Sequence, residues 1–482
     1  MRITFINPTL GGDYSALDIA ITTLATIINK KSHHLARILD FTFHKRTWRE
    51  KLKKHIHEFK PNIIGFSTNS LYFKYIIKIS EEIKKLNPNI KIIIGGYYAT
   101  TNPQIIRNSL FDYLFVGDAD ETIVEFLNKL EKKKELRNIR GLWYYEEDGT
   151  LIHNAGYFYE NLDDLPYLDW DLWEDLDKYF YFLGMLYFIG SRGCIYNCSF
   201  CEAREFANAV DPKRYYRKMS PKRFAEELAY QWKKYENRGL RLIQVFDQIP
   251  TLEENWIIEF CEHYKKIANI NKHKYSMFSR ADNLNEKKIK LLKEAGCNML
   301  RIGFEHGDEE IRNKILRKGL SDEKIEEVST LLKKYRMKST SYYILGVPGE
   351  TKKSILKTIK LAKKINSERS AFFIFKPLTN ESVKIIEKTG SKMVLNRLNK
   401  ADNITFKAIL KSNDLSAWEI DFFQIYAYLL TFLPRLTKTI KRKPIRYWIE
   451  LITYLMKGIT YGLSLNYLVT YYHIYGYDNI FY

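Results

Sequence analysis

Short apolar runs alternate with amphipathic stretches over the first 135 residues, which is the pattern of strands separated by helices. Apolar, β-branched runs predict strands at 3–7, 36–41, 62–68, 91–96 and 113–118. Helical spacing covers 16–31, 47–59 and a stretch that ends near Leu86. Five strands joined in this way predict a Rossmann-like, doubly wound parallel sheet, whose ligands bind beyond the carboxyl ends of the strands.

The pattern changes over residues 136–183, which we expect to link two domains. Asp148-Gly149 lies between two apolar runs and predicts a β-hairpin. An acidic stretch follows and is broken by Pro166.

A second series of strands and helices is predicted for residues 184–400. Its expected strands are 187–191, 242–247, 275–280, 299–305, 340–346 and 370–377. Six strand–helix units predict a partial (βα)6 barrel of the TIM type, in which chemistry collects at the carboxyl ends of the strands.

Residues 401–482 hold no strand–helix alternation and are expected to form a helical C-terminal cap. Two long aromatic-rich helical stretches flank a basic segment, residues 435–446. The alternative to a cap is a substrate lid or a helix pair on a membrane surface, since basic and aromatic side chains together suit anionic lipid.

Composition narrows the class of protein. The 482 residues are 45% hydrophobic with a net charge of +20, so the chain is globular and attracts anionic partners. Three of the five cysteines crowd into eight residues, while Cys261 and Cys297 stand alone, which excludes a disulfide framework and favours a reducing cytoplasm. We find neither a signal-peptide pattern nor an apolar run long enough to span a membrane, and therefore expect a cytoplasmic protein, with peripheral membrane contact as the variant.

The cysteine cluster is the strongest chemical signal. Cys194, Cys198 and Cys201 follow the first expected barrel strand, where a barrel active site belongs. Three thiolates this close suit an iron–sulfur cluster or zinc. Structural zinc takes four ligands, and no fourth cysteine or histidine lies at zinc spacing, so the pattern favours a four-iron cluster with one iron open to a small molecule.

The C-x3-C-x2-C spacing, with Phe200 before the last cysteine, resembles the signature of the radical S-adenosylmethionine superfamily. The surrounding Ser-Arg-Gly-Cys run resembles the subfamily with an N-terminal cobalamin-binding domain, although Ile195 replaces the usual proline. That subfamily includes the anaerobic magnesium-protoporphyrin monomethyl ester cyclase, hopanoid-modifying enzymes and class B methyltransferases. The runs PNIIGFS, IIIGGYYAT, FVGDADET, DDLP, VFDQ, RADNL, EAGC, IGFEHG and LGVPGET match family motifs in order over roughly residues 1–380.

The resemblance assigns roles in the barrel. It implies that Cys194, Cys198 and Cys201 ligate a [4Fe–4S] cluster and that S-adenosylmethionine lies beside it. The residues implied to bind S-adenosylmethionine are Phe200 near the adenine, Asp247 near the methionine amino group, Arg280 near its carboxylate, Glu305 near the ribose, and Gly346 and Pro348 in a shaping loop. For the three charged residues the alternative is pairing with one another. We expect His306 to be a polar residue at the rim.

The resemblance also implies cobalamin. Its predicted contacts are Ser67, Thr68, Gly95, Gly96, Gly117 and Asp118, at the carboxyl ends of the N-terminal strands. The D-x-H-x-x-G motif that supplies a histidine to cobalt is absent, so His44 is interpreted as a surface histidine. The alternative is a degenerate domain kept as a scaffold.

The implied reaction begins with reductive cleavage of S-adenosylmethionine to a 5′-deoxyadenosyl radical, an oxygen-sensitive chemistry. With cobalamin, the prediction is C-methylation of an unactivated carbon on an apolar small molecule or lipid; cyclisation, oxidation or ring remodelling are the alternatives. An acidic flavodoxin or ferredoxin is the expected electron donor. An RNA-modifying enzyme of the methylthiotransferase kind is disfavoured because it needs a second cysteine triplet, and a non-catalytic corrinoid carrier because the barrel motifs are present; nucleic acid is not an expected partner.

Overall fold

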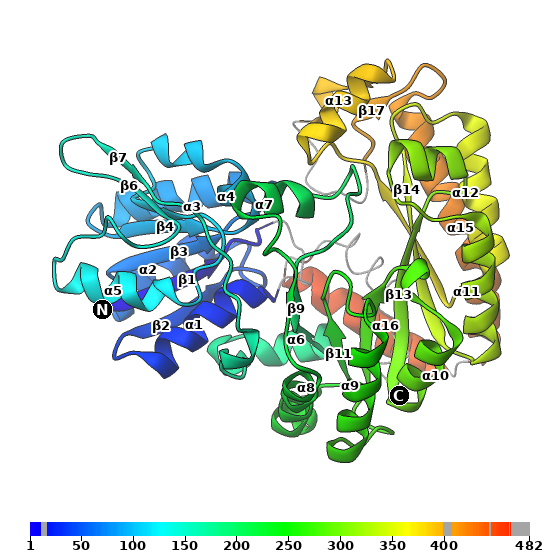
Figure 1. The fold of residues 1–482 in the computed structure, drawn as a ribbon, viewed down its shortest axis with the longest axis horizontal. Coiled ribbons are helices and arrows are strands. Elements are labelled where there is room, and N and C mark those ends of the chain that lie inside the picture. Colours follow the sequence, from blue (N-terminus) through cyan, green and yellow to red (C-terminus); the bar gives the residue numbers. More distant parts are fainter. Residues whose placement is uncertain (11–16, 399–406, 443–444, 462, 464–482) are drawn as a thin grey trace.

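The computed structural model describes residues 1–10, 17–398, 407–442, 445–461 and 463 (Figure 1). Figure 1 shows an N-terminal α/β unit beside a second α/β unit, with long C-terminal helices on one flank of the latter. Among the described helices, none combines the length and the apolar character needed to cross a membrane.

The N-terminal sheet has the strand order β2-β1-β3-β4-β5-β6-β7. Its first five strands are parallel: β1 (Arg2–Asn7), β2 (Leu35–Asp40), β3 (Ile63–Ser67), β4 (Lys91–Gly95) and β5 (Tyr113–Phe115). The connecting helices are α1 (Ile19–Lys31), α2 (Trp48–Phe59), α3 (Phe73–Leu86), α4 (Tyr97–Thr101) and α5 (Thr122–Glu131). The predicted doubly wound parallel sheet is therefore confirmed, and the order reverses between β1 and β3, where such sheets bind ligands.

The predicted hairpin is β6 (Leu142–Tyr145) and β7 (Leu151–His153). It extends the N-terminal sheet, because β6 pairs antiparallel with β5. Helix α6 (Leu176–Phe182) then leads into the second unit.

The second sheet has the order β15-β14-β13-β12-β11-β8, and all its pairs are parallel. Its strands are β8 (Met185–Phe188), β11 (Leu242–Val245), β12 (Tyr275–Ser279), β13 (Cys297–Glu305), β14 (Lys338–Leu345) and β15 (Arg369–Ile374). Between them run α8 (Pro221–Tyr235), α9 (Glu254–Ile267), α10 (Glu286–Glu294), α11 (Asp322–Lys334) and α12 (Lys352–Ile365). Chain order and strand order coincide, and β8 does not pair with β15, so the expected partial barrel is confirmed.

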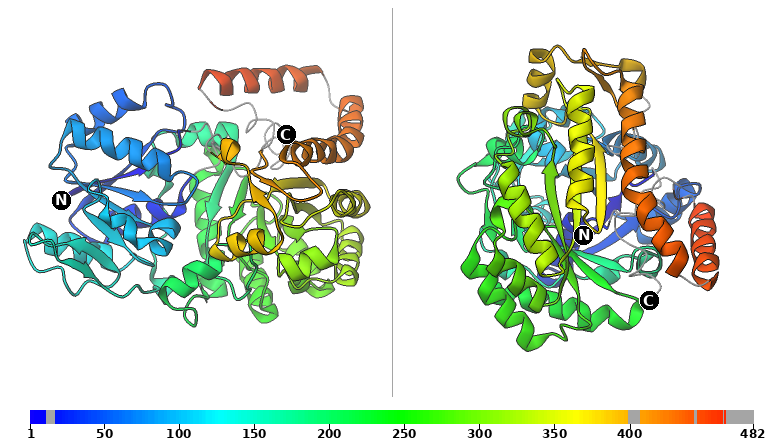
Figure 2. Two further views of the ribbon diagram at one scale, coloured as in Figure 1. Left: turned by 90° about the horizontal axis from the view of Figure 1, so that it is seen from above. Right: turned by 90° about the vertical axis from the view of Figure 1, so that its right-hand side faces the viewer.

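The C-terminal region packs on the barrel. Two short strands, β16 (Lys392–Met393) and β17 (Leu410–Lys411), follow α13 (Asn380–Lys388) and pair antiparallel, and α14 (Leu395–Leu398) lies between them in the chain. Strand β17 is the one short strand within the described part of the region predicted to form a helical cap, and two long helices follow it. Helix α15 (Ala417–Arg442) covers β15, where Gln424 Nε2 donates to the carbonyl of Phe372 at 2.7 Å. Helix α16 (Ile445–Thr460) lies on the same flank as α15 (Figure 2).

Candidate active site

The cysteine loop joins β9 (Ser191–Arg192) to α7 (Ala203–Val210), and β9 pairs with β10 (Arg217–Lys218). Gly193 lies between β9 and Cys194 with φ +94°, a left-handed conformation that favours glycine. A Cβ on Gly193 would also collide with the carbonyl oxygen of Tyr215. The entry to the loop therefore needs glycine for two independent reasons.

Ser199 anchors the middle of this loop to two other parts of the barrel. Its Oγ donates to the Ile315 carbonyl at 2.6 Å, and its N–H donates to the Leu316 carbonyl at 3.1 Å. Its own carbonyl accepts from Thr379 Oγ1 at 2.7 Å and from Ser382 Oγ at 3.0 Å. All hydrogen-bonding groups of Ser199 are paired, so the backbone between Cys198 and Cys201 is held rigidly.

Arg280 lies against the second cysteine. Its Nη1 is 3.6 Å from Cys198 Sγ, and its guanidinium lies 3.6 Å above the ring centroid of Tyr196. The other guanidinium nitrogens bind Asp282 at 2.9–3.0 Å and the Lys318 carbonyl at 2.5 Å. A buried positive charge therefore lies next to Cys198.

The three thiols of Cys194, Cys198 and Cys201 form the donor set of this loop. Burial raises the pKa of the Cys194 thiol, and the positive charges of Arg280 and Lys318 act against this shift. Three thiolates suit a four-iron cluster that leaves one iron open to a small molecule.

Two carboxyl groups lie at the carboxyl ends of β11 and β13, the strands on either side of β12. Asp247, beyond β11, is 1% exposed and accepts from the Gly190 N–H at 2.8 Å; burial raises its pKa to about 7. Glu305 ends β13 with φ +64° and binds Lys318 Nζ at 2.7 Å. Lys318 thus connects Glu305 to Arg280, a link that no sequence motif signals.

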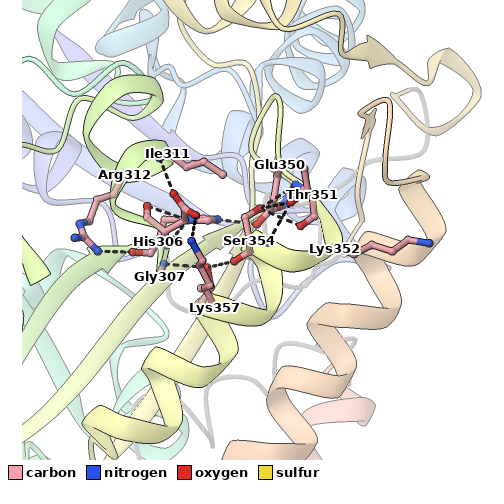
Figure 3. A network of polar contacts seen from close by, with 12 residues as sticks. His306, Gly307, Ile311, Arg312, Glu350, Thr351, Lys352, Ser354 and Lys357 are labelled. Atoms are coloured by element: carbon pink, nitrogen blue, oxygen red, sulfur yellow. Dashed lines mark hydrogen bonds and ion pairs between the residues drawn. The ribbon is translucent and has the colours of Figure 1, made fainter.

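The loop after β14 is held by a buried pair (Figure 3). Gly346, at φ +73°, donates its N–H to Glu350 Oε2 at 2.5 Å, and Glu350 Oε1 lies 2.7 Å from His306 Nε2. His306 and Glu350 are both completely buried. The prediction of a rim position for His306 is therefore wrong: the imidazole joins the loops after β13 and β14.

The two remaining residues expected near S-adenosylmethionine, Phe200 and Pro348, are apolar side chains. Phe200 packs against a cluster that includes Leu316 and Val347. Pro348 is buried in the same loop as Gly346. Both residues shape the wall of the barrel mouth through packing.

A cavity of about 650 Å³ lies between the N-terminal sheet and the barrel. Five of the six residues predicted to contact cobalamin line it: Ser67, Gly95, Gly96, Gly117 and Asp118. Thr68 is buried outside the lining, where its Oγ1 donates to the Gly95 carbonyl at 2.6 Å and accepts from the Ala99 N–H at 2.9 Å.

Glycines at the strand ends line one wall of the cavity. A Cβ on Gly95 would meet its nearest atoms, Cβ and O of Phe115, at 3.8 Å, so a side chain begins there without a clash. Gly96 and Gly117 have φ +87° and +86°, which favours glycine, and a Cβ at either position would collide with the backbone of Thr68 or Tyr157. The opposite wall contains Tyr187, Phe246 and Gly193, the last next to Cys194. His44 is not part of this lining; it is partly exposed and hydrogen-bonded to Asp175 at 2.7 Å.

A polar trio on the cavity wall was missed by the sequence reasoning. Tyr97 Oη lies 2.8 Å from Tyr215 Oη, and Gln248 Nε2 donates to Tyr97 Oη at 2.8 Å. Burial raises the pKa of Tyr215 to about 12, so its hydroxyl stays protonated. Tyr97 directly follows the Gly95-Gly96 strand end and Gln248 ends the VFDQ run, so both had a usable signal, whereas Tyr215 comes from a loop outside the quoted motifs.

An ion cluster joins the two domains beside the cavity. Arg192 binds Asp120 through two bonds of 2.7 and 2.8 Å, and it lies 3.2 Å from Asp118. Asp118 also binds Arg217 at 2.5 Å. Burial has the largest single effect and would raise the pKa of Asp120, but the charge and hydrogen bonds of Arg192, a backbone hydrogen bond and the charge of Arg217 together lower the pKa. Asp118 thus lines the cavity while contacting two arginines.

Comparisons with known proteins agree with this geometry. The model of the radical SAM superfamily matches residues 188–362, and that of the B12 binding domain matches residues 5–127. An uncharacterized methyltransferase of Pyrococcus horikoshii is 25% identical over 423 residues, covering 86% of this chain and 87% of the relative. The anaerobic magnesium-protoporphyrin IX monomethyl ester cyclase of Rubrivivax gelatinosus is 23% identical over 344 residues, covering 68% and 59%.

Among solved structures, the radical S-adenosylmethionine methyltransferase TsrM from Kitasatospora setae, with cobalamin and a [4Fe–4S] cluster bound, has a TM-score of 0.66. It is 17% identical, and the match covers 84% of this chain and 78% of that chain. The chain therefore belongs to the radical S-adenosylmethionine superfamily, in the subfamily with an N-terminal B12-binding domain, and is an enzyme whose cofactors are a [4Fe–4S] cluster, S-adenosylmethionine and cobalamin.

Proposed function

We propose that this enzyme transfers a methyl group to an unactivated carbon of an apolar small molecule or lipid. The observation that carries the proposal is the cavity of about 650 Å³ between the two domains. Its wall includes Gly193, next to the first cysteine, and Gly95, Gly96 and Gly117 at the opposite strand ends. A substrate in this space would touch both cofactor sites at once.

We assign the cluster to Cys194, Cys198 and Cys201. When bound, the three cofactors supply the radical and methyl chemistry, and the protein binds, orients and excludes water. Ser199, with all its hydrogen-bonding groups paired, fixes the thiolates, and Arg280 offsets negative charge at Cys198.

We assign S-adenosylmethionine to the barrel mouth beside this loop. Asp247 offers a carboxylate to the methionine ammonium, and that ammonium would favour the ionised form of a carboxyl whose pKa burial raises to about 7. Arg280 would attract the methionine carboxylate and Glu305 would accept from a ribose hydroxyl. Phe200, Gly346 and Pro348 would shape the space for the adenine.

We assign cobalamin to the glycine-lined wall of the cavity. Gly95, Gly96 and Gly117 line the wall against which a corrin ring would lie, and Ser67 and Asp118 offer hydrogen-bond acceptors there. Thr68 acts through Gly95, whose carbonyl it holds. His44 is engaged by Asp175 outside the cavity, so the protein supplies no imidazole to cobalt from this position.

Two matched variants test this assignment. Gly95→Leu adds a side chain where a Cβ meets no atom within 3.8 Å, so we expect it to fold and keep iron while losing cobalamin. Cys198→Ala should lose iron and keep cobalamin. Both variants and the parent are reconstituted anaerobically with iron, sulfide and hydroxocobalamin, desalted, and assayed for iron and corrinoid.

The reaction is tested with S-adenosylmethionine that carries a deuterated methyl group. Incubation of the reconstituted parent with an apolar extract of the source cells should place that methyl group on carbon, as detected by mass spectrometry. Deuterated products equally abundant with Gly95→Leu would contradict the role of cobalamin. Formation of 5′-deoxyadenosine with no labelled product would favour cyclisation or oxidation.

We also propose an acidic electron donor, such as a flavodoxin or ferredoxin, because the net charge is +20. The second-order rate of cluster reduction by such a donor should fall as ionic strength rises. A rate that does not change with salt would argue against electrostatic recruitment.

A further inference from the structure

Each of the two long C-terminal helices turns an apolar stripe to solvent. On α16 the stripe has the spacing i, i+4, i+7, i+11 and i+14, and Ile445 at its start is 78% exposed. On α15 the spacing is i, i+4, i+7 and i+11, and Trp418 at its start is 63% exposed. The remaining exposed members are Ile449, Ile452, Met456 and Ile459 on α16, and Phe422, Ile425 and Leu429 on α15. We call these two sets the outer stripes.

The outer stripes are not the faces by which the helices pack on the barrel. Helix α15 packs through a different stripe, with Ile420 and Ala427 buried. Helix α16 packs through Tyr447 and Tyr454, and Tyr454 Oη donates to the Phe182 carbonyl at 3.1 Å. At 3.6 residues per turn the buried and exposed stripes lie on about opposite sides of each helix. A helix on a globular surface needs one apolar stripe, and each of these has two.

The sequence between the two outer stripes is positively charged. The segment 435–446, which runs from the end of α15 into α16, has six basic residues and no acidic one: Arg435, Lys438, Lys441, Arg442, Lys443 and Arg446. The acidic side chains of the two helices are each paired, Glu419 with Lys352 at 2.9 Å, Asp421 with Arg397 at 2.6 Å and Glu450 with Arg446 at 2.9 Å.

We propose that α15 and α16 dock the enzyme on the surface of a bilayer that contains anionic lipid. Both views in Figure 2 place α16 outermost on the flank of the barrel that α15 covers. The outer stripes would enter the boundary between headgroups and acyl chains, and the basic segment would bind lipid phosphates. Neither helix is suited to span the bilayer. Docking is independent of which reaction the barrel catalyses.

The docking helix also contacts the barrel mouth. Ile420, on the inner side of α15, packs so close to Gly346 that a Cβ there would approach Ile420 Cγ2 to 3.0 Å. An enzyme docked through α15 would therefore hold its S-adenosylmethionine loop one helix diameter from the membrane, about 10 Å.

Two variants with the same change in charge test the proposal. Ile449→Glu/Met456→Glu adds two negative charges to the outer stripe of α16. Thr453→Glu/Thr460→Glu adds two to exposed polar positions of the same helix and serves as the control. All proteins are full-length and reconstituted, with equal iron and cobalamin content required of both variants as evidence of folding.

Binding is measured by co-sedimentation with vesicles of equal parts phosphatidylglycerol and phosphatidylcholine, and with pure phosphatidylcholine. We expect the parent to sediment with the anionic vesicles. It should be released by 0.5 M salt, because the Debye length then shortens to about 4 Å and the charges are screened. The stripe variant should bind about tenfold or more weakly, since two apolar side chains lose their burial, while the control changes far less.

Three results would overturn the proposal. The first is a parent that does not sediment with either vesicle. The second is an equal loss of binding in the two variants, which would mean that the added negative charge, and not the loss of apolar side chains, weakens binding to the vesicles. The third is a parent that is dimeric in light scattering and becomes monomeric in the stripe variant, because a second copy would then cover the outer stripes.

Discussion

Arg192→Met should weaken the junction between the two domains. The guanidinium of Arg192 forms two hydrogen bonds to Asp120, of 2.7 and 2.8 Å, and Asp120 is 7% exposed. Methionine keeps most of the apolar stem but leaves the Asp120 carboxylate buried without its partner. Asp118 keeps Arg217 at 2.5 Å, so the loss falls mainly on Asp120.

Removing one member of a buried ion pair costs about 3–5 kcal/mol of unfolding free energy, whereas an exposed pair contributes about 0–1 kcal/mol. Asp120→Asn in the Arg192→Met background removes the unpaired charge and should restore part of the loss. We therefore expect a double-mutant cycle in urea, followed by circular dichroism, to give a coupling free energy above about 2 kcal/mol.

The loss of unfolding free energy in Arg192→Met should depend on pH in one direction. The pKa of Asp120 is lowered in the folded protein, so its pair stabilises the fold above the ordinary aspartate pKa of 3.8, and this contribution is lost as the pH falls through the lowered value. The deficit of Arg192→Met should be full at pH 7 and shrink below about pH 4. A deficit under about 1 kcal/mol at pH 7 would refute the inference that this junction is shielded from water.

Three further changes probe the site itself. The Asp247 pKa is raised to about 7, so the neutral carboxyl stabilises the protein fully below pH 3.8, and this stability is lost as the pH rises through about 7. The melting temperature of Asp247→Asn without S-adenosylmethionine should therefore differ less between pH 5 and pH 8 than that of the parent. Equal differences in the two proteins would contradict the assignment. Gly193→Ala should lose more than about half of the bound iron, since φ +94° disfavours alanine; full iron content would show that the loop can shift. His306→Leu should destabilise the protein by about 1.5–3 kcal/mol because Glu350 loses a hydrogen bond, while His306→Gln keeps a donor and costs less; two variants with the same melting temperature would count against the pair.

Some parts of the site were predictable because their signal is local. The cysteine spacing places three thiols within eight residues whatever the rest of the chain does, and glycine at a strand end indicates close backbone approach without knowledge of its neighbours. Gly95, Gly96 and Gly117 were therefore identified as cavity residues from the strand pattern and the family motifs. Thr68, next in sequence to Ser67, does not line the cavity because side chains alternate at a strand end.

His306 was misplaced for a physical reason. A histidine at the end of a barrel strand can face solvent or turn inward, and an acceptor decides between these states. That acceptor is Glu350, 44 residues later on another loop. Likewise, Arg192 and Asp120 are 72 residues apart and belong to different domains, so no sequence window contains both.

The sequence by itself determined the two strand–helix series, the position of the cysteine loop at a strand end and the family to which its motifs point, because apolar periodicity and short-range spacing are properties of neighbouring residues. The tertiary structure alone decided which buried polar groups meet: Lys318 with Glu305, Tyr97 with Tyr215 and Gln248, and His306 with Glu350. It also decided that the outer stripes of α15 and α16 face solvent. The spacing of apolar residues in the sequence is the same whether the stripe packs on a barrel or is exposed to solvent.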